Sequence, residues 1–333
     1  MTTKTPTIRN ATPEDSASVA HLFRLAYGKS SHPCQQSEHV RESICSGTTA
    51  WRLAIDQDRV VACITLIINE WNHSWELARA VTLPEYRGEG LGTELMQCSV
   101  NDACASSSCD IIVGFPRSRT MLHIVSGLEP SMLPVGHDGA INVANGTREY
   151  HAITCAANPR ARFAHYIPIA PSLADKEFVR RELFAPLGLH PTRAEYPSQW
   201  VVGDGIVDPD LRPFSFGYDP LCPSDAIEIT GYNADSKDAA HVAQELISML
   251  DSFYHTRHVR LAVLIDKTEL IEKLTCAGFH ITAYLPAWYL HKEGRYDCVL
   301  LVRRQFPEEP IDHGIRDEVD RFRRGLTVRA PGS

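Results

Sequence analysis

The sequence predicts an α/β protein whose N-terminal part is a mixed β-sheet covered by helices and whose C-terminal part is a second, smaller α/β domain. Three observations lead to this fold class. Strand-like and helix-like segments alternate over residues 7–155 in the order βααβββαβα, which implies a mixed sheet with helices packed on it. A chain of 333 residues has room for two domains at roughly 150 residues per domain. Its hydrophobic fraction of 44% and charged fraction of 22% are those of a globular protein.

The chain begins with a short expected strand at 8–11, followed by two expected helices. Thr12 is placed as the N-cap of the first helix, and Pro13 follows at its first position. Apolar residues at the helical period continue this helix to about Gly28. The second helix is short and is expected over 37–45.

Three strands rich in β-branched and aromatic residues come next. A hairpin turn at Asp56–Arg59 joins the first two of them. The expected strands of this part are 50–56, 60–69, 75–83 and 110–115, and the expected helices are 92–105 and 120–126. The first domain is taken to cover residues 1–155.

The composition changes after about Asn158. Ten of the 21 prolines lie between Pro159 and Pro223, a density that suits turns and edge strands better than a long helix. We therefore interpret 156–225 as a Pro-rich linker with edge elements, 226–306 as the second domain and 307–333 as a charged tail. The expected strands are 226–230, 259–265, 279–285 and 296–302, and the expected helices are 239–250, 269–276 and 317–324.

Charge and hydropathy exclude several classes of protein. The chain has 33 Lys and Arg against 41 Asp and Glu, a net charge of −8, and no basic run suited to a duplex, so no nucleic acid partner is expected. Its longest nearly apolar stretch, Val60–Ile68, is far shorter than the about 20 residues that span a bilayer, and the N-terminus has no apolar signal segment. Ten scattered cysteines without a Cys-x-x-Cys pair indicate reduced thiols. We expect a cytoplasmic protein with no membrane partner and, without a His-Glu-x-x-His motif, no metal.

One motif, Leu83-Pro-Glu-Tyr-Arg-Gly-Glu-Gly-Leu-Gly-Thr93, points to chemistry. Gly88, Gly90 and Gly92 alternate at the junction between an expected strand and an expected helix. Glycine lets the backbone approach a ligand closely, and the unpaired N–H groups of a helix N-terminus attract anions. The motif is not a Walker loop, because no lysine follows Gly92, and its spacing is not the Gly-x-Gly-x-x-Gly of a Rossmann fold. An ordinary glycine turn is the remaining alternative.

The pattern Arg87-x-x-Gly90-x-Gly92 resembles the pyrophosphate loop of the GNAT superfamily of N-acetyltransferases, which use acetyl-coenzyme A. The resemblance extends over residues 7–150, through the Ile-Arg-x-Ala-x-x-x-Asp opening at Ile8–Asp15, the order of elements, and Val81–Gly88. It implies that acyl-CoA inserts where two parallel strands separate. Loop amides would bind the pyrophosphate and the end of the preceding strand would bind the pantetheine arm. The implied cofactor-binding residues are Val81, Thr82, Leu83, Arg87, Gly88, Glu89, Gly90, Leu91, Gly92 and Thr93.

The same resemblance implies a general base on the strand before the loop. Acetyl transfer requires a neutral amine, and a free alkylammonium has a pKa near ~10, so a base must remove its proton. In the family this base is often a carboxylate, and Glu76, eleven residues before Arg87, has the matching position. A solvated strand glutamate is the alternative, and Glu70 and His73 are nearby substitutes.

The acid that protonates the departing thiolate is less regular. In the family it is frequently a tyrosine four residues before a Gly-Phe pair. Here the pair is Gly127-Leu128, and the corresponding position is His123, a departure from the pattern. An imidazole can donate a proton near neutral pH, although a purely structural helix histidine is the alternative.

The second half resembles the closing portion of a GNAT domain and the C-terminal module of atypical two-part GNAT proteins. The resemblance rests on Leu270–Phe279, Tyr284–Pro286 and Tyr296–Leu301. This degenerate half lacks an Arg-x-x-Gly-x-Gly loop, so it is not expected to bind coenzyme A. It would cover the acceptor pocket or form an interface, a homodimer interface included. Its aromatic residues line an acceptor cleft or pack in the core: Tyr284, Trp288, Tyr289 and Tyr296.

The expected function is direct transfer of an acetyl group from acetyl-CoA to an amine of a small molecule within a ternary complex. Two alternatives stay open. The chain can be a non-catalytic CoA-binding sensor or interaction protein, which the missing tyrosine favours. It can also carry out other acyl-CoA chemistry, either thioester hydrolysis or acyl transfer to oxygen.

Overall fold

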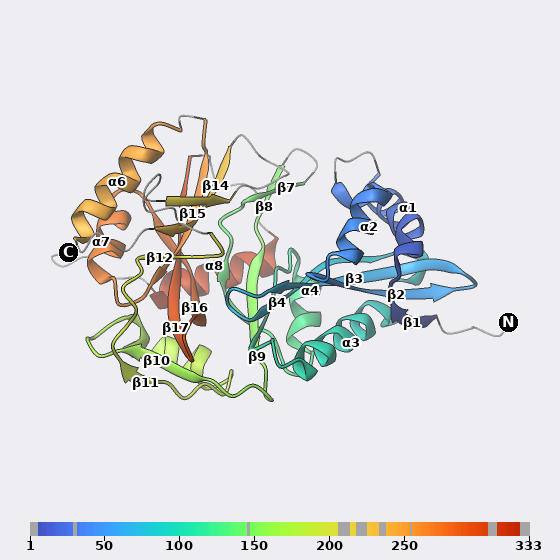
Figure 1. The fold of residues 1–333 in the computed structure, drawn as a ribbon, viewed down its shortest axis with the longest axis horizontal. Helices are drawn as coiled ribbons and strands as arrows, with labels where there is room; N and C mark the ends of the chain where they lie inside the picture. Colours follow the sequence, from blue (N-terminus) through green and yellow to red (C-terminus); the bar gives the residue numbers. More distant parts are fainter. Residues whose placement is uncertain are drawn as a thin grey trace. The chain divides into compact units, whose positions relative to one another are not determined.

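The computed structural model divides the chain into two compact units (Figure 1). Unit 1 comprises residues 1–115, 123–132 and 154–161, and unit 2 comprises 116–122, 133–153 and 162–333. The predicted domain limits at 155, 225 and 306 stay predictions. The structure describes residues 6–28, 32–144, 147–205, 214–217, 225–232, 238–253, 255–305 and 312–326. Parts of the predicted linker, 206–213 and 218–224, and of the predicted tail, 307–311 and 327–333, lie outside the described residues.

The first part of the chain confirms the predicted order of elements. Ser16–Tyr27 ends at Gly28 as expected, and the helix expected from residue 92 begins one residue earlier. The elements are β1 (Thr7–Asn10), α1 (Ser16–Tyr27), α2 (Ser37–Cys45), β2 (Thr49–Asp56), β3 (Arg59–Asn69), β4 (Ser74–Thr82), α3 (Leu91–Ala105), β5 (Ile111–Gly114), α4 (Arg119–Ser126) and β9 (Ala152–Ala157).

The strands of unit 1 pair in the order β1-β2-β3-β4-β5-β9. All neighbours are antiparallel except β4 and β5, which are parallel. Gln57 and Asp58 form the predicted hairpin turn with φ of 47° and 64°, the left-handed conformation that two-residue hairpin loops require. The sheet is therefore mixed, as predicted, and β4, the first strand of its one parallel pair, lies directly before the glycine motif.

Helices cover both faces of this sheet, α1 and α2 on one side and α3 on the other (Figure 1). Two neighbouring residues of β2 contact helices on opposite sides of the sheet, because successive side chains of a strand point to opposite faces. Trp51 donates its indole N–H to Ser43 of α2 at 3.0 Å, whereas Arg52 forms an ion pair with Asp102 of α3. We call the Trp51 side the α1/α2 face.

Unit 2 contains every strand and helix expected after residue 225, together with strands that composition did not reveal. β16 and β17 are longer than expected, and β10, β11 and β12 lie within the predicted linker. The elements are β6 (Leu133–His137), β7 (Asn142–Ala144), β8 (Thr147–Glu149), β10 (Ala164–Pro168), α5 (Glu177–Val179), β11 (Thr192–Ala194), β12 (Val201–Val202), β13 (Phe214–Gly217), β14 (Ala226–Tyr232), α6 (Ala239–Asp251), β15 (His258–Leu264), α7 (Thr268–Cys276), β16 (His280–His291), β17 (Gly294–Arg304) and α8 (His313–Leu326).

The sheet of unit 2 runs in the order β6-β16-β17-β15-β14-β13, and a buried carboxylate stands at its centre. Asp297 of β17 accepts hydrogen bonds from the Tyr284 hydroxyl at 2.6 Å and the Ala287 N–H at 2.7 Å, and its Oδ1 lies 2.5 Å from Nε2 of His165. Arg295, itself fully buried, donates to the Ala287 carbonyl at 2.7 Å. Tyr284 is fully buried and therefore belongs to the core of unit 2.

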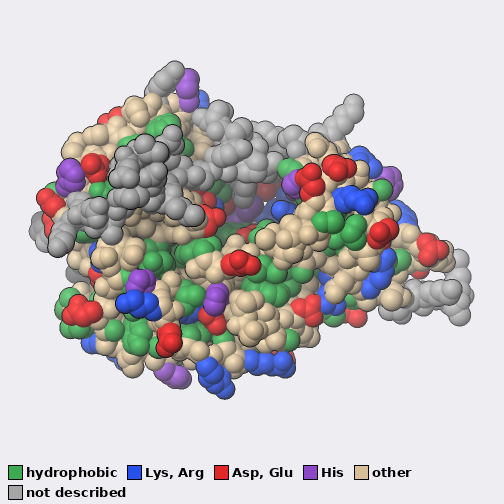
Figure 2. All heavy atoms as spheres, viewed as in Figure 1, with side chains coloured by type: hydrophobic (Ala, Val, Ile, Leu, Met, Phe, Trp, Pro, Cys, Tyr) green, Lys and Arg blue, Asp and Glu red, His purple; other side chains and the backbone are tan. Residues whose placement is uncertain are grey.

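On the face drawn in Figure 2, acidic and basic side chains are interspersed across the described surface. Among the described residues, helix length and hydropathy nowhere reach what a membrane-crossing helix needs.

Candidate functional site

The glycine motif forms the turn between β4 and α3. Gly88 and Gly90 have φ of 84° and 81°, a left-handed conformation that strains any residue with a Cβ. A Cβ at either position would meet nothing within 4 Å. The backbone conformation, not lack of space, therefore requires glycine here.

The N-terminus of α3 has amide groups without an acceptor inside the helix. Among the described residues no side chain caps this helix, and its first backbone bond runs from the Glu94 N–H to the Gly90 carbonyl at 2.9 Å. The N–H groups of Leu91, Gly92 and Thr93 precede that bond, so they have no acceptor within the helix. The three residues before the helix, 88–90, are exposed. This turn can accept an anion.

Side chains fix the turn on both sides. Arg87 donates from Nε to the Thr82 carbonyl at 3.1 Å, and its guanidinium stays exposed. Tyr86 donates its hydroxyl proton to Asp56, in the β2–β3 hairpin, at 2.7 Å. The turn is therefore anchored before any ligand binds.

The parallel pair β4–β5 ends before β4 does. Its register runs from Ser74 opposite Ile111 to Leu77 opposite Gly114, while β4 continues to Thr82. The Leu83 N–H binds the Val61 carbonyl at 3.0 Å. Because backbone groups of an antiparallel pair alternate in direction, those of Thr82 point away from β3. On the open side of β4, Thr82 rather than Leu83 presents its backbone.

The two predicted proton-transfer residues lie on different elements. Glu76 is half-buried in β4, opposite Ile67 of β3 and Val113 of β5. His123 is exposed on α4. No hydrogen bond or ion pair within the described part of the chain joins His123 to Glu76 or to the glycine turn. The catalytic roles of both residues stay predictions.

Sequence reasoning missed Arg79, which lies in a bulge of β4. Its φ is 53°, and its guanidinium carbon is 5.7 Å from the centre of the Trp51 ring. Nothing in Ala78-Arg79-Ala80 signals a bulge, because the extra residue becomes visible only when β3 is paired with β4.

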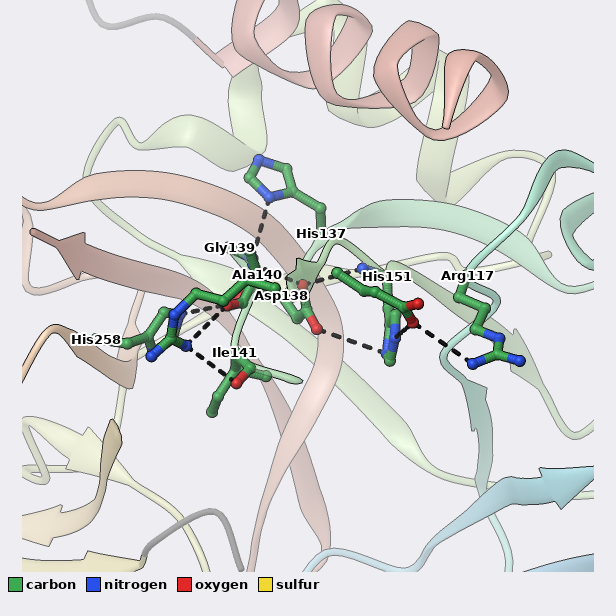
Figure 3. Close-up of polar contacts among 10 residues, drawn as sticks. Arg117, His137, Asp138, Gly139, Ala140, Ile141, His151 and His258 are labelled. Carbon is green, nitrogen blue, oxygen red and sulfur yellow. Dashed lines mark hydrogen bonds and ion pairs between the residues drawn. The ribbon is translucent and has the colours of Figure 1, made fainter. Parts of the chain in front are cut away.

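A second missed feature is a row of charged residues in unit 2 (Figure 3). Asp138 is fully buried and accepts hydrogen bonds at Oδ1 from the Ala140 and His151 N–H groups, at 2.9 and 3.1 Å. The His151 ring lies 3.6 Å from Asp138 Oδ2 and 3.7 Å from Glu149, and Arg117 lies 3.5 Å from Glu149.

The charges of this row affect one another. Burial raises the pKa of Asp138, whereas the adjacent His151 ring lowers the pKa of Glu149. Glu149 and His151 are two residues apart, but Arg117 and Asp138 come from other segments of the chain, so no motif reveals the row. The row holds a histidine between two carboxylates.

Residues 17–114 match the family model described as the Acetyltransferase (GNAT) family. No curated protein matches the chain.

Similar solved structures include three acetyltransferases. The ribosomal-protein-S5-alanine acetyltransferase of Vibrio fischeri is 14% identical with a TM-score of 0.41, over 48% of this chain and 96% of that one. The spermidine/spermine N-acetyltransferase of Vibrio cholerae is 17% identical with a TM-score of 0.39, over 46% and 95%. Arabidopsis thaliana NAA60, in complex with acetyl-CoA, is 12% identical with a TM-score of 0.41, over 46% and 98%. Likeness at this level carries no argument about activity.

Proposed function

Residues 17–114 of this chain form a GNAT acetyltransferase domain, and from that premise we propose that the protein transfers an acetyl group from acetyl-CoA to an amine of a small molecule. The observation that carries the proposal is the anchored turn at the N-terminus of α3, with exposed glycines and amides that lack acceptors. A diphosphate is the ligand that such a turn suits.

In this proposal acetyl-CoA lies along the end of β4 and over the glycine turn. The pyrophosphate binds amides of 88–93, and the exposed Arg87 guanidinium adds positive charge. The pantetheine arm follows β4 beyond Leu77, where β4 no longer pairs with β5, and there the Thr82 N–H is the backbone group available to it, because the Thr82 carbonyl already accepts from Arg87. The proposed cofactor-binding residues are Val81, Thr82, Leu83, Arg87, Gly88, Glu89, Gly90, Leu91, Gly92 and Thr93.

The proposed chemistry is a single direct transfer. Glu76 accepts a proton from the ammonium of the acceptor, directly or through water, and the neutral amine attacks the thioester carbonyl carbon. The C–S bond then breaks, the nitrogen of the new amide releases its second proton to solvent, and the thiolate of coenzyme A takes a proton from His123. The half-buried position of Glu76, one residue before the β4–β5 register ends, supports its role as the base.

One observation favours the sensor alternative. His123 occupies the place of the expected tyrosine and is exposed, and its side chain forms no hydrogen bond or ion pair with any described residue. Without a working acid, the domain would bind coenzyme A and release no thiol. The loss of His123 as an acid would leave the base in place and would affect only the second proton transfer. Binding of acetyl-CoA and turnover are therefore tested separately.

Calorimetry with acetyl-CoA tests the binding site. Gly90→Glu adds a negative charge and a Cβ at φ 81° and should abolish binding. Gly47→Glu is the matched control, because Gly47 has φ 71°, equally open surroundings and a place after α2. Tight binding by Gly90→Glu, or equal loss in both variants, contradicts the site. Thiol release with a library of amines then separates transferase from sensor.

A further inference from the structure

We propose that Arg79 binds an oxyanion group of the acceptor, so that the acceptor is an amine that also carries a carboxylate or a phosphate. The inference rests on the proposed acetyl transfer and narrows its substrate class. It begins from a cation in unit 1 that the proposed chemistry leaves unused.

The backbone conformation directs the Arg79 side chain to one face of the sheet. Cys63 pairs with Val81 and Thr65 with Ala78, so Ile64 alone stands opposite two residues of β4, Arg79 and Ala80. This is a β-bulge, a device that redirects a side chain. The φ of 53° at Arg79 is costly for a residue with a Cβ, and such strain persists mainly where a site requires it.

The bulge places Arg79 on the same face as Glu76. Trp51 pairs with Thr65, and Thr65 pairs with Ala78, so these three side chains share the α1/α2 face. Glu76 is two residues before Ala78 in a regular stretch and therefore points to that face too. The Arg79 guanidinium lies over the Trp51 ring. The proposed base and the cation thus start three residues apart on one strand and face the same side.

Among the described residues, no carboxylate forms an ion pair with this cation. Arg79 Nη1 is buried without a hydrogen-bond partner, and the described residues give its guanidinium no carboxylate. Its guanidinium makes a cation–π contact with Trp51. A buried charged donor that lacks an acceptor is costly, and most proteins pair such a group. The missing partner is what a ligand can supply.

Three titratable groups near Arg79, the His32 imidazole and the thiols of Cys34 and Cys63, are neutral at pH 7. Burial, reinforced by the Arg79 charge, lowers the pKa of His32 to about 4, and burial raises the pKa of Cys34 to about 11. Burial also raises the pKa of the Cys63 thiol. At neutral pH the imidazole and both thiols are therefore uncharged, so none of the three offsets the positive charge of Arg79, and Glu76 is the acidic residue placed on the same face.

A positive potential beside the reacting amine selects among acceptors. It repels a polyamine, whose further ammonium groups would face Arg79. It attracts an amine with a carboxylate or phosphate, and the planar guanidinium can bind either oxyanion through two parallel hydrogen bonds. With the amine at Glu76 and the oxyanion at Arg79, one small zwitterion would contact both residues.

The test measures acceptor binding by calorimetry on protein saturated with coenzyme A, which cannot react, and KM by thiol release with acetyl-CoA. Matched probes are phenylalanine against phenethylamine, and phosphoethanolamine against ethylamine, with spermidine as the polyamine. Wild-type protein should prefer the oxyanion member of at least one pair tenfold or more, about 1.4 kcal/mol, and the preferred pair identifies carboxylate or phosphate.

Arg79→Gln should remove the preference, and Arg79→Lys, which keeps the charge without the planar fork, should retain part of it. Arg52→Gln is the control, because Arg52 lies on the opposite face with Asp102 and should keep the preference. Unfolding midpoints establish that each variant folds.

If the wild-type protein binds acetyl-CoA but shows no oxyanion preference, the inference about the acceptor is overturned and the proposed function is not. A preference retained in Arg79→Gln has the same consequence. Failure to bind acetyl-CoA overturns the proposed function, and the inference with it.

Discussion

Replacing Tyr284 by Phe removes one hydroxyl from the buried network of unit 2 and leaves the rest of the side chain, including the aromatic ring, unchanged. The hydroxyl lies 2.6 Å from Asp297 Oδ2, and both side chains are fully buried. The lost bond has a carboxylate as its acceptor, and such bonds contribute about 1.5–3 kcal/mol. The carboxylate oxygen also stays buried without its donor, so we expect the upper part of that range. Since water cannot reach Asp297, no water molecule can replace the lost hydrogen-bond donor in the variant.

Urea unfolding followed by tryptophan fluorescence measures this change, as the shift in midpoint multiplied by the slope m. Tyr232→Phe is the matched control in the same unit. Its hydroxyl donates to Glu245 at 2.7 Å in a partly buried place, where solvent screens the bond, and about 0–1 kcal/mol is expected. A loss below about 0.5 kcal/mol for Tyr284→Phe, or one equal to the control, would refute the reasoning.

Two further predictions concern pH and catalysis. Burial lowers the pKa of His258 to about 3 and that of His32 to about 4. Unfolded histidine binds a proton near pH 6.5, so the full stability is present above that pH. As the pH falls from there toward these two pKa values, the free energy of unfolding should decrease by about 1.4 kcal/mol per pH unit for each histidine. Urea midpoints between pH 7 and 4.5 check this, and an unchanged slope in His258→Gln contradicts it. Glu76→Gln should lower kcat about 10²–10⁴-fold at unchanged acetyl-CoA affinity. His123→Ala should lower kcat likewise, because His123 is the proposed acid. Wild-type turnover by either variant removes the role assigned to the replaced residue.

Local signals predicted much of unit 1 correctly. The turn at Asp56–Arg59, the end of α1 at Gly28 and the start of α3 after Gly90 are each determined by a few neighbouring residues. Glycine and proline restrict their own φ, and helix periodicity repeats within a few turns. The placement of the glycine turn before a helix N-terminus followed from the same signals.

The segment rich in proline shows where local signals fail. The prolines suggested a linker with edge elements but did not locate those elements; in the structure β10 pairs with β17 and β12 pairs with β15. These strands are two to five residues long, and partners far along the chain stabilise them. A short strand at the edge of a sheet has too few residues to show an alternating pattern.

The sequence by itself determined the order of elements in unit 1 and the glycine turn at a helix N-terminus, because both depend on residues that are neighbours in the chain. Only the tertiary structure decided that Arg79 sits in a bulge over Trp51, and that His165 meets Asp297 across 132 residues. A bulge exists only relative to the partner strand, and a buried charge is defined by what packs around it. Such relations depend on distant residues, and no local pattern carries them.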